Sequence, residues 1–159
     1  MVIVGNRELY INDFEKVVFG KSQVKLDAKA LENLNACHEF LKGFAKNKVI
    51  YGINTGFGPM AQYRIEDDKI QILQYNLIRS HCSGAGDALP PQTVRPVMLS
   101  RLNPLIIGKS GIHQSVVILL QDLLNLDICP VIYHHGGVGA SGDLVQLAHL
   151  ALGLIGEGE

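Results

Sequence analysis

Gly136-Gly137-Val138-Gly139-Ala140-Ser141-Gly142-Asp143 is the stretch around which this sequence is organised. It follows the apolar run 128–133 and opens an apolar helix that is expected to continue almost to the last residue. Glycine adopts positive φ angles at little steric cost, and the small residues between the glycines leave the backbone unobstructed. The segment can therefore approach a ligand closely, or its backbone can react with itself.

Length and composition predict one globular domain. The chain has 159 residues, 47% hydrophobic and 18% charged, which is enough to bury a sizeable core. The net charge of −1 gives no electrostatic reason to expect a nucleic acid or an anionic membrane as partner. No run reaches the roughly 18 apolar residues of a membrane span, and the N-terminus lacks a signal-peptide layout. The three cysteines form no CxxC pair, so we expect reduced thiols in a cytoplasmic protein.

Helical periodicity dominates, so the expected fold class is mainly α, with a short hairpin or edge strand within residues 1–10. Asn12 or Asp13 is expected to cap a short helix. Asp27 is expected to cap a stronger one, whose apolar residues recur at helical spacing as far as Phe44. Further helices are expected over residues 67–80, 92–107, 113–125 and 144–155.

The last of these helices is apolar around nearly its whole circumference. Such a helix requires burial on every side, yet the sequence ends four residues after Ile155. We therefore expect residues 1–159 to be a single N-terminal domain of a longer protein.

Residues 137–142 also form a literal GxGxxG, which predicts a dinucleotide site when it joins a strand to a helix. Three observations weaken this alternative. Mostly helical sequence precedes the motif, no other βαβ pattern is visible, and the acidic residue expected about 20 positions later would fall beyond the last residue. The nucleophile elbow GxSxG fails because Asp143 occupies its last position, and the P-loop fails because GK[ST] is absent.

Reaction of the backbone with itself is the remaining possibility. Attack of the Gly142 nitrogen on the Ala140 carbonyl closes a five-membered ring around Ser141. Loss of two waters, one of them from the Ser141 side chain, gives an imidazolone with an exocyclic methylene, an electrophile that ordinary side chains cannot supply. The partial positive charge at the following helix N-terminus favours electron flow towards this ring. Asp143 could handle protons during closure or simply act as a helix N-terminal charge.

Three segments together resemble the aromatic amino acid ammonia-lyase family. Residues 137–144 with Leu147–Leu150 resemble the family signature, in which Ala-Ser-Gly cyclises autocatalytically to 4-methylidene-imidazol-5-one (MIO). Tyr51–Gly58 is similar to the family's YGxNTGFG loop, and Ser80–Gly84 to its SHxxG segment. The motifs occur in the family's order, and the chain resembles the N-terminal third of such a lyase.

The resemblance implies a role for each matching residue. Ala140, Ser141 and Gly142 would form MIO, and Tyr51 would be the base that removes a β-proton from the substrate. A free phenol has a pKa of about 10, so such a base needs nearby positive charge or hydrogen-bond donors. Asn54 and Phe57 would shape the Tyr51 loop and the substrate site. Without the resemblance, Tyr51 is more simply explained as a core anchor of its loop.

His81 matches the family position that contacts the substrate ring. An imidazole there suits the imidazole of histidine or the hydroxyl of tyrosine, whereas phenylalanine offers no polar ring atom. The sequence therefore predicts elimination of ammonia to trans-urocanate or trans-p-coumarate, with histidine and tyrosine left open and phenylalanine third. A lyase and an aminomutase are also not distinguished.

The resemblance further implies a homotetramer whose active sites combine residues of three subunits, with no metal and no nucleotide. The isolated chain is then expected to be inactive, because it lacks its own C-terminal region and sister subunits. A non-catalytic fragment with an uncyclised triplet stays open. His134 and His135 are adjacent and unsuited to chelating one metal, and His38 and His149 are expected to be structural.

Overall fold

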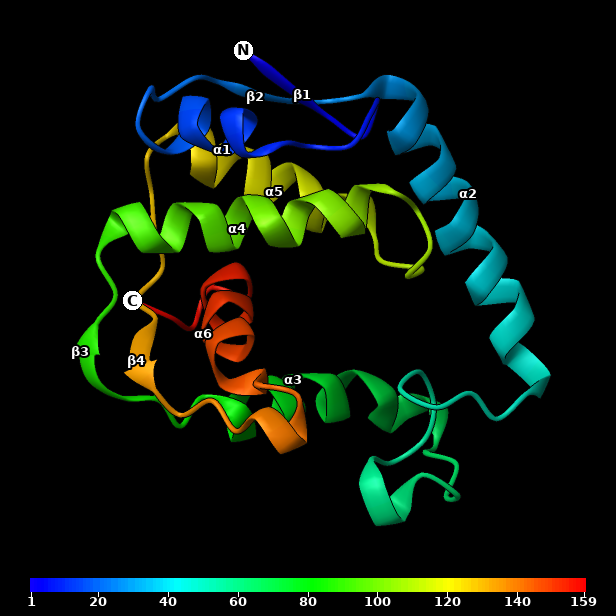
Figure 1. Cartoon of the computed structure of the whole chain (residues 1–159). Coiled ribbons are helices and arrows are strands. Elements are labelled where there is room, and N and C mark those ends of the chain that lie inside the picture. The colour runs from blue at the N-terminus through cyan, green and yellow to red at the C-terminus, as the bar shows by residue number, and fades with distance from the viewer.

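The helical periodicity of the sequence is realised in the computed structural model, which describes the backbone of residues 1–159 and every side chain except those of Asn47 and Ser141. The described residues form six α-helices and two small sheets (Figure 1). The helices are α1 (Ile11–Val18), α2 (Ala28–Phe44), α3 (Ile70–His81), α4 (Pro91–Ile106), α5 (Gln114–Asn125) and α6 (Leu144–Leu154). The strands are β1 (Val2–Val4), β2 (Val24–Leu26), β3 (Ala85–Ala88) and β4 (Tyr133–His135). The predicted fold class, mainly α, is confirmed.

Helix α4 forms the centre of the hydrophobic core. Met98, Leu99 and Leu102 on α4 are completely buried, as are Val117 and Leu120 on α5. In Figure 1, α4 crosses the molecule with α1 and α5 on one side and α6 on the other. No helix within the described part of the chain is both long and apolar enough to span a bilayer.

The helix caps follow the sequence closely, with one correction. Asp27 Oδ1 accepts a hydrogen bond from the Ala30 N–H at 2.9 Å, so it is the predicted N-cap of α2. For α1, Tyr10 holds the N-cap position instead of Asn12 or Asp13. Asp13 lies one turn later, where its carboxylate accepts from the Tyr10 N–H at 3.1 Å and pairs with Arg7. Asp13 is one of the two residues predicted to cap α1, and it does accept a backbone hydrogen bond there, but the N-cap position itself belongs to Tyr10.

The short strands differ from the sequence prediction. β1 is an edge strand, but it pairs in parallel with β2 across α1, with Val2 opposite Val24, rather than in a hairpin. A βαβ unit is therefore present, contrary to the expectation that none exists. β4 pairs antiparallel with β3, which the sequence did not predict. This pairing brings the segment after α3 beside the segment that enters the glycine-rich stretch.

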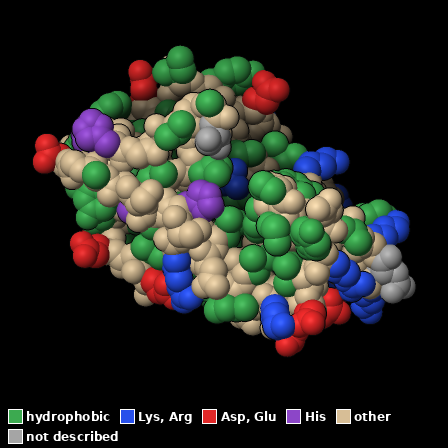
Figure 2. All heavy atoms as spheres, turned by 90° about the horizontal axis from the view of Figure 1, so that it is seen from below, with side chains coloured by type: hydrophobic (Ala, Val, Ile, Leu, Met, Phe, Trp, Pro, Cys, Tyr) green, Lys and Arg blue, Asp and Glu red, His purple; other side chains and the backbone are tan. Residues whose placement is uncertain are grey.

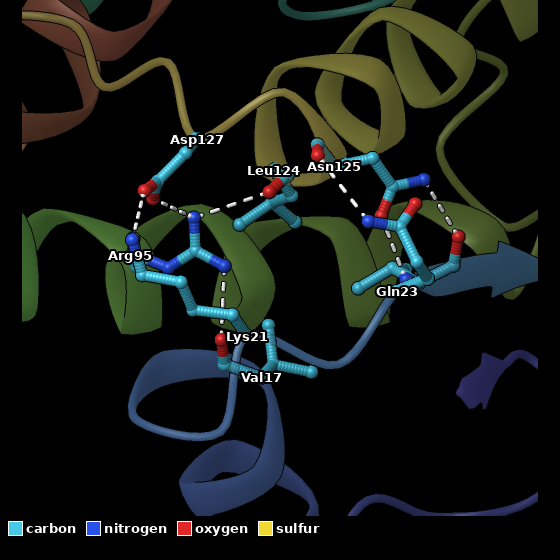
Figure 3. A network of polar contacts seen from close by, with 8 residues as sticks. Val17, Lys21, Gln23, Arg95, Leu124, Asn125 and Asp127 are labelled. Atoms are coloured by element: carbon cyan, nitrogen blue, oxygen red, sulfur yellow. Dashed lines mark hydrogen bonds and ion pairs between the residues drawn. The ribbon is translucent and has the colours of Figure 1, made fainter.

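A buried arginine joins α1, α4 and α5 (Figure 3). Arg95 is only 4% exposed, and its guanidinium donates to the Val17 carbonyl at 2.9 Å, the Leu124 carbonyl at 3.1 Å and Asp127 Oδ1 at 2.6 Å. Lys21 pairs with the other carboxylate oxygen of Asp127 at 2.6 Å. Arg95 thus satisfies carbonyls at the C-terminal ends of two helices, where intrahelical donors are lacking.

Replacing Arg95 with methionine is expected to lower the free energy of unfolding by about 2–4 kcal/mol, because two carbonyl acceptors lose a buried charged donor. The matched variant Lys21→Met removes an exposed ion pair and should cost less than about 1 kcal/mol. Urea unfolding with an unchanged m-value measures both. Equal midpoints for the two variants would contradict this account of the network.

Candidate functional site

One cavity of about 570 Å³ collects the predicted site residues of two motifs at the start of α6. Tyr51 and Phe57 come from the loop after α2, His81 ends α3, and Leu144 and Leu147 belong to the first turns of α6. The remaining lining residues are Gly58, Leu77, Ile78, Arg101 and Ala148. Figure 2 shows apolar side chains exposed on the face seen from below, the side on which α3 lies in Figure 1. Segments as far apart in the sequence as Tyr51 and Ala148 thus form a mostly apolar wall with a few polar groups.

The Tyr51 loop is held from inside by Asn54. Asn54 is buried, its Oδ1 accepts from the Ile50 N–H at 2.8 Å, and its Nδ2 donates to the carbonyls of Lys48 at 2.7 Å and Ala45 at 3.3 Å. Both amide donors are therefore committed to the loop, and Asn54 is not among the cavity-lining residues. Its position fits the expectation that it shapes the loop.

Tyr51 itself is not a core anchor. Its side chain is 63% exposed at the cavity, and its ring lies edge-on to Phe57 with centroids 5.9 Å apart. Arg101 of α4 also lines this cavity. The sequence analysis did not identify Arg101, because nothing in its local pattern separates it from an ordinary exposed helix residue.

The last turn of α3 fixes the tautomer of His81. Its Nδ1 lies 2.8 Å from the Leu77 carbonyl, which can only accept, and 3.1 Å from Ser80 Oγ. Nδ1 must therefore carry a proton, so the neutral ring keeps its lone pair on Nε2. His81 can offer this cavity a hydrogen-bond acceptor.

The glycine-rich stretch forms a tight turn before α6. Gly139–Ser141 is a 3₁₀ turn, and Gly142 and Asp143 both adopt left-handed conformations, with φ of 88° and 49°. The Gly142 N–H bonds back to the Gly139 carbonyl at 3.3 Å. The triplet Ala140–Gly142 therefore lies within this turn, directly before α6. The Ser141 side chain, one of the predicted catalytic groups, lies outside the described residues.

Asp143 lies against this turn rather than capping α6. It makes no side-chain cap hydrogen bond, although it occupies the N-cap position. A methyl group added at Gly137 would come within 3.0 Å of Asp143 Oδ1, and one added at Gly139 within 3.7 Å of Oδ2. The carboxylate thus lies close to Gly137 and Gly139, and the approach at Gly137 is tight enough to favour glycine. This arrangement fits a group that exchanges protons with the turn.

His149 of α6 follows the lining residue Ala148 but does not itself line this cavity, and it is 8% exposed. Its Nε2 accepts a hydrogen bond from the Gly84 N–H at 3.1 Å. Burial lowers the pKa of His149 below its ordinary value of 6.5. Tyr133, Glu157 and Glu159 line a small cavity beside it, and Glu157 is paired with Arg79.

Acidification is expected to destabilise the chain through His149 before the carboxylates titrate. Between the native pKa of His149 and about 6.5, the unfolded chain binds more protons than the native one, so the free energy of unfolding rises with pH in this window. Above the window, the contribution of His149 to stability is fully present. The slope from one group cannot exceed about 1.4 kcal/mol per pH unit. Urea unfolding near pH 5.5 and 7.5 measures it, and His149→Gln should show a shallower dependence. Equal slopes in the two proteins would refute this assignment.

The other histidines differ from these two. His134 and His135 are exposed on or beside β4, with ring centroids 6.2 Å apart. His38 Nδ1 lies 2.7 Å from the Gly111 carbonyl, a structural contact as expected. Among the residues whose side chains are described, no group of three or more potential metal ligands comes together.

The strand before the GxGxxG stretch is antiparallel to its neighbour, which is not the parallel context of a dinucleotide site.

The Tyr51 loop, the His81 segment and the helix after the glycine-rich turn thus meet at one cavity of this mainly α fold. The model of the aromatic amino acid lyase family matches residues 9–159. The chain belongs to this family.

Relatives and solved structures agree with the family. The chain is 44% identical over 155 residues to the histidine ammonia-lyase of Deinococcus radiodurans, covering 97% of this chain and 30% of that enzyme. It resembles the ergothioneine-degrading ergothionase of Treponema denticola with a TM-score of 0.92 and 31% identity, over 99% of this chain and 32% of that one. The histidine ammonia-lyase of Trypanosoma cruzi gives a TM-score of 0.87 and 32% identity, over 99% and 30% of the two chains. The chain thus spans about a third of the length of the relatives it matches.

Proposed function

We propose that this chain is the N-terminal part of an ammonia-lyase that converts L-histidine to trans-urocanate and ammonia, with MIO formed from Ala140, Ser141 and Gly142. The observation that carries the proposal is the shared cavity of Tyr51, His81 and the first turns of α6. The name of the Deinococcus radiodurans relative supports histidine as the substrate. The relatives' greater length supports a further region that completes the enzyme.

The residues of the turn fit the group they would form. Gly137 and Gly139 leave room for the Asp143 carboxylate beside the triplet, and Gly142 has the left-handed backbone that glycine tolerates. Ala140, Ser141 and Gly142 would form MIO, which would supply an electrophile for departure of the substrate amino group. Asp143 accepts and returns protons while the turn closes.

Tyr51 removes the β-proton of the substrate from its exposed position in the cavity lining. Its exposure at the cavity leaves the phenol oxygen accessible to substrate, and Arg101 lines the same cavity. Phe57 holds the Tyr51 ring edge-on, which limits its rotation. A general base needs this combination of access and orientation.

His81 selects the substrate ring through Nε2. With Nδ1 committed to the Leu77 carbonyl, Nε2 accepts a hydrogen bond from the imidazole N–H of histidine. Phenylalanine has no donor on its ring and would leave this acceptor unpaired, which a site built for a polar group rejects strongly. Tyrosine is the second candidate, because its phenol O–H can donate to the same nitrogen.

The proposal extends to the assembly that completes the site. Tyr51 is exposed at the cavity, and we infer that the C-terminal region and sister subunits of a homotetramer cover it. Residues 1–159 alone should therefore release no ammonia from histidine. Measurable turnover by the purified chain would contradict this part of the proposal.

His81→Phe in the intact lyase is expected to lower kcat/KM for histidine by about 10²-fold and to raise the phenylalanine-to-histidine ratio at least about tenfold, because a polar selector becomes apolar. His134→Phe, an exposed histidine outside the cavity, is the matched control and should leave the ratio unchanged. Initial rates with both amino acids measure it. An unchanged ratio in His81→Phe would remove His81 as the selecting residue.

A further inference from the structure

We propose that His149 is a positioning residue, whose Nε2 fixes the segment carrying His81 against the helix that follows the Ala140–Gly142 triplet. This inference rests on the proposed function and assigns a role to a residue that lies outside the substrate cavity. The geometry that supports it is a three-way contact at Gly84, two residues after the C-cap of α3.

Gly84 packs directly on His149. Its N–H donates to His149 Nε2 at 3.1 Å, and a methyl group added at Gly84 would lie 2.6 Å from the same nitrogen and 3.0 Å from Tyr133 Cβ. The φ angle of Gly84 is not positive, so the requirement for glycine here is the space and not the backbone conformation. The contact is therefore a close, directional one between a backbone amide and a buried imidazole.

Gly84 also lies close to Gly136 at the entrance to the glycine-rich stretch. A methyl group added at Gly136 would lie 3.2 Å from Gly84 Cα and 2.7 Å from Val145 Cγ1 of α6. Tyr133 packs edge-on against the His149 ring, with centroids 5.2 Å apart. The segment after His81, the entrance to the triplet and α6 thus meet around one hydrogen bond.

This bond determines the state of the imidazole. Nε2 accepts, so the neutral ring carries its proton on Nδ1. Protonation of Nε2, or replacement by a side chain without an acceptor, leaves the Gly84 N–H unpaired in a part-buried position. The segment that carries His81 then loses its directional contact with α6.

A second contact also keeps α3 and α6 together, but it does not fix the position of Gly84 relative to His149. Arg79 donates through Nε to Glu157 Oε2 at 2.7 Å and through Nη2 to Oε1, which joins α3 to the residues after α6. Both side chains are partly exposed, and the ion pair tolerates small shifts of the backbone. A variant at His149 should therefore stay folded while the position of His81 relaxes.

His149→Gln and His149→Met test the proposal as a matched pair in the intact lyase. Glutamine keeps an acceptor near the position of Nε2, whereas methionine has a similar length and no amide acceptor. We expect His149→Met to lower kcat/KM for histidine about tenfold, mainly through KM, and to lower the histidine-to-phenylalanine ratio, while His149→Gln keeps both near wild type. Intact mass should show the same loss of two waters in all three proteins.

The outcomes separate positioning from packing and from failure of the proposed function. If His149→Met lowers kcat/KM for histidine and for phenylalanine equally, and only in proportion to the loss of folded protein, the positioning role is overturned. It is also overturned if His149→Gln lowers kcat/KM as much as His149→Met does. The hydrogen bond itself is tested without activity, by imidazole ¹⁵N shifts and Gly84 amide exchange in residues 1–159. A Nδ1–H tautomer with a protected Gly84 amide supports the proposal even if the wild-type enzyme does not accept histidine, and a Nε2–H tautomer overturns it.

Discussion

Replacement of Ser141 by alanine is expected to reduce turnover of L-histidine by the intact lyase on the order of 10³-fold or more, the range seen when a group that acts chemically is removed. The proposed methylene of MIO derives from the Ser141 side chain, so an alanine can supply neither the second water nor the double bond. Intact mass measures the same event independently. The wild-type protein should be lighter than its sequence by two waters, and the variant by no more than one.

Ser100→Ala on an exposed position of α4 is the control for the Ser141 variant. It should keep both the activity and the two-water deficit. A wild-type protein with the full mass of its sequence and normal turnover would show that elimination proceeds without a cyclised triplet, and this would contradict the proposed cofactor.

Tyr51→Phe is expected to lower kcat by about 10²–10⁴-fold, the usual contribution of a general base. The phenyl ring can keep the edge-on contact with Phe57, and the phenol is already exposed, so folding and the two-water deficit should not change. Tyr63→Phe, another exposed tyrosine of the same loop region, should retain activity. A Tyr51→Phe enzyme with near-normal kcat would exclude Tyr51 as the base.

Local patterns predicted the helices well, since capping and periodicity act over a few residues. Asp27 caps α2 and His113 caps α5, and both helices begin within one residue of the expected start. Helix α4 begins at Pro91, one residue before the expected start, and continues through Pro96. Packing of α4 in the core outweighs the one backbone hydrogen bond that Pro96 cannot make.

Contacts between distant segments could not be predicted in the same way. The parallel pairing of β1 with β2 and the antiparallel pairing of β3 with β4 involve three or four residues each, too few for a distinct pattern. Their positions depend on the helices between them. The glycine-rich stretch could therefore be recognised in the sequence, but the β3–β4 pairing that places it beside Gly84 could not.

In the candidate site too, residues in local motifs could be predicted and contacts between distant segments could not. Tyr51 and His81 were found because each belongs to a recognisable motif, and the structure places both at one cavity. Arg101 and the Gly84–His149 contact were missed, because an exposed arginine and a histidine on an apolar helix have no local signature. Their roles depend on which segments fold against them.

The central claim is that this chain belongs to a lyase whose His81 selects a ring with a hydrogen-bond donor. The most direct test is kcat/KM of the intact enzyme for L-histidine, L-tyrosine and L-phenylalanine, followed by release of ammonia. We predict that histidine is the best substrate and gives trans-urocanate, that tyrosine is second, and that phenylalanine is at least about 10²-fold poorer than histidine. Preference for phenylalanine, or no ammonia from any of the three, would contradict the account.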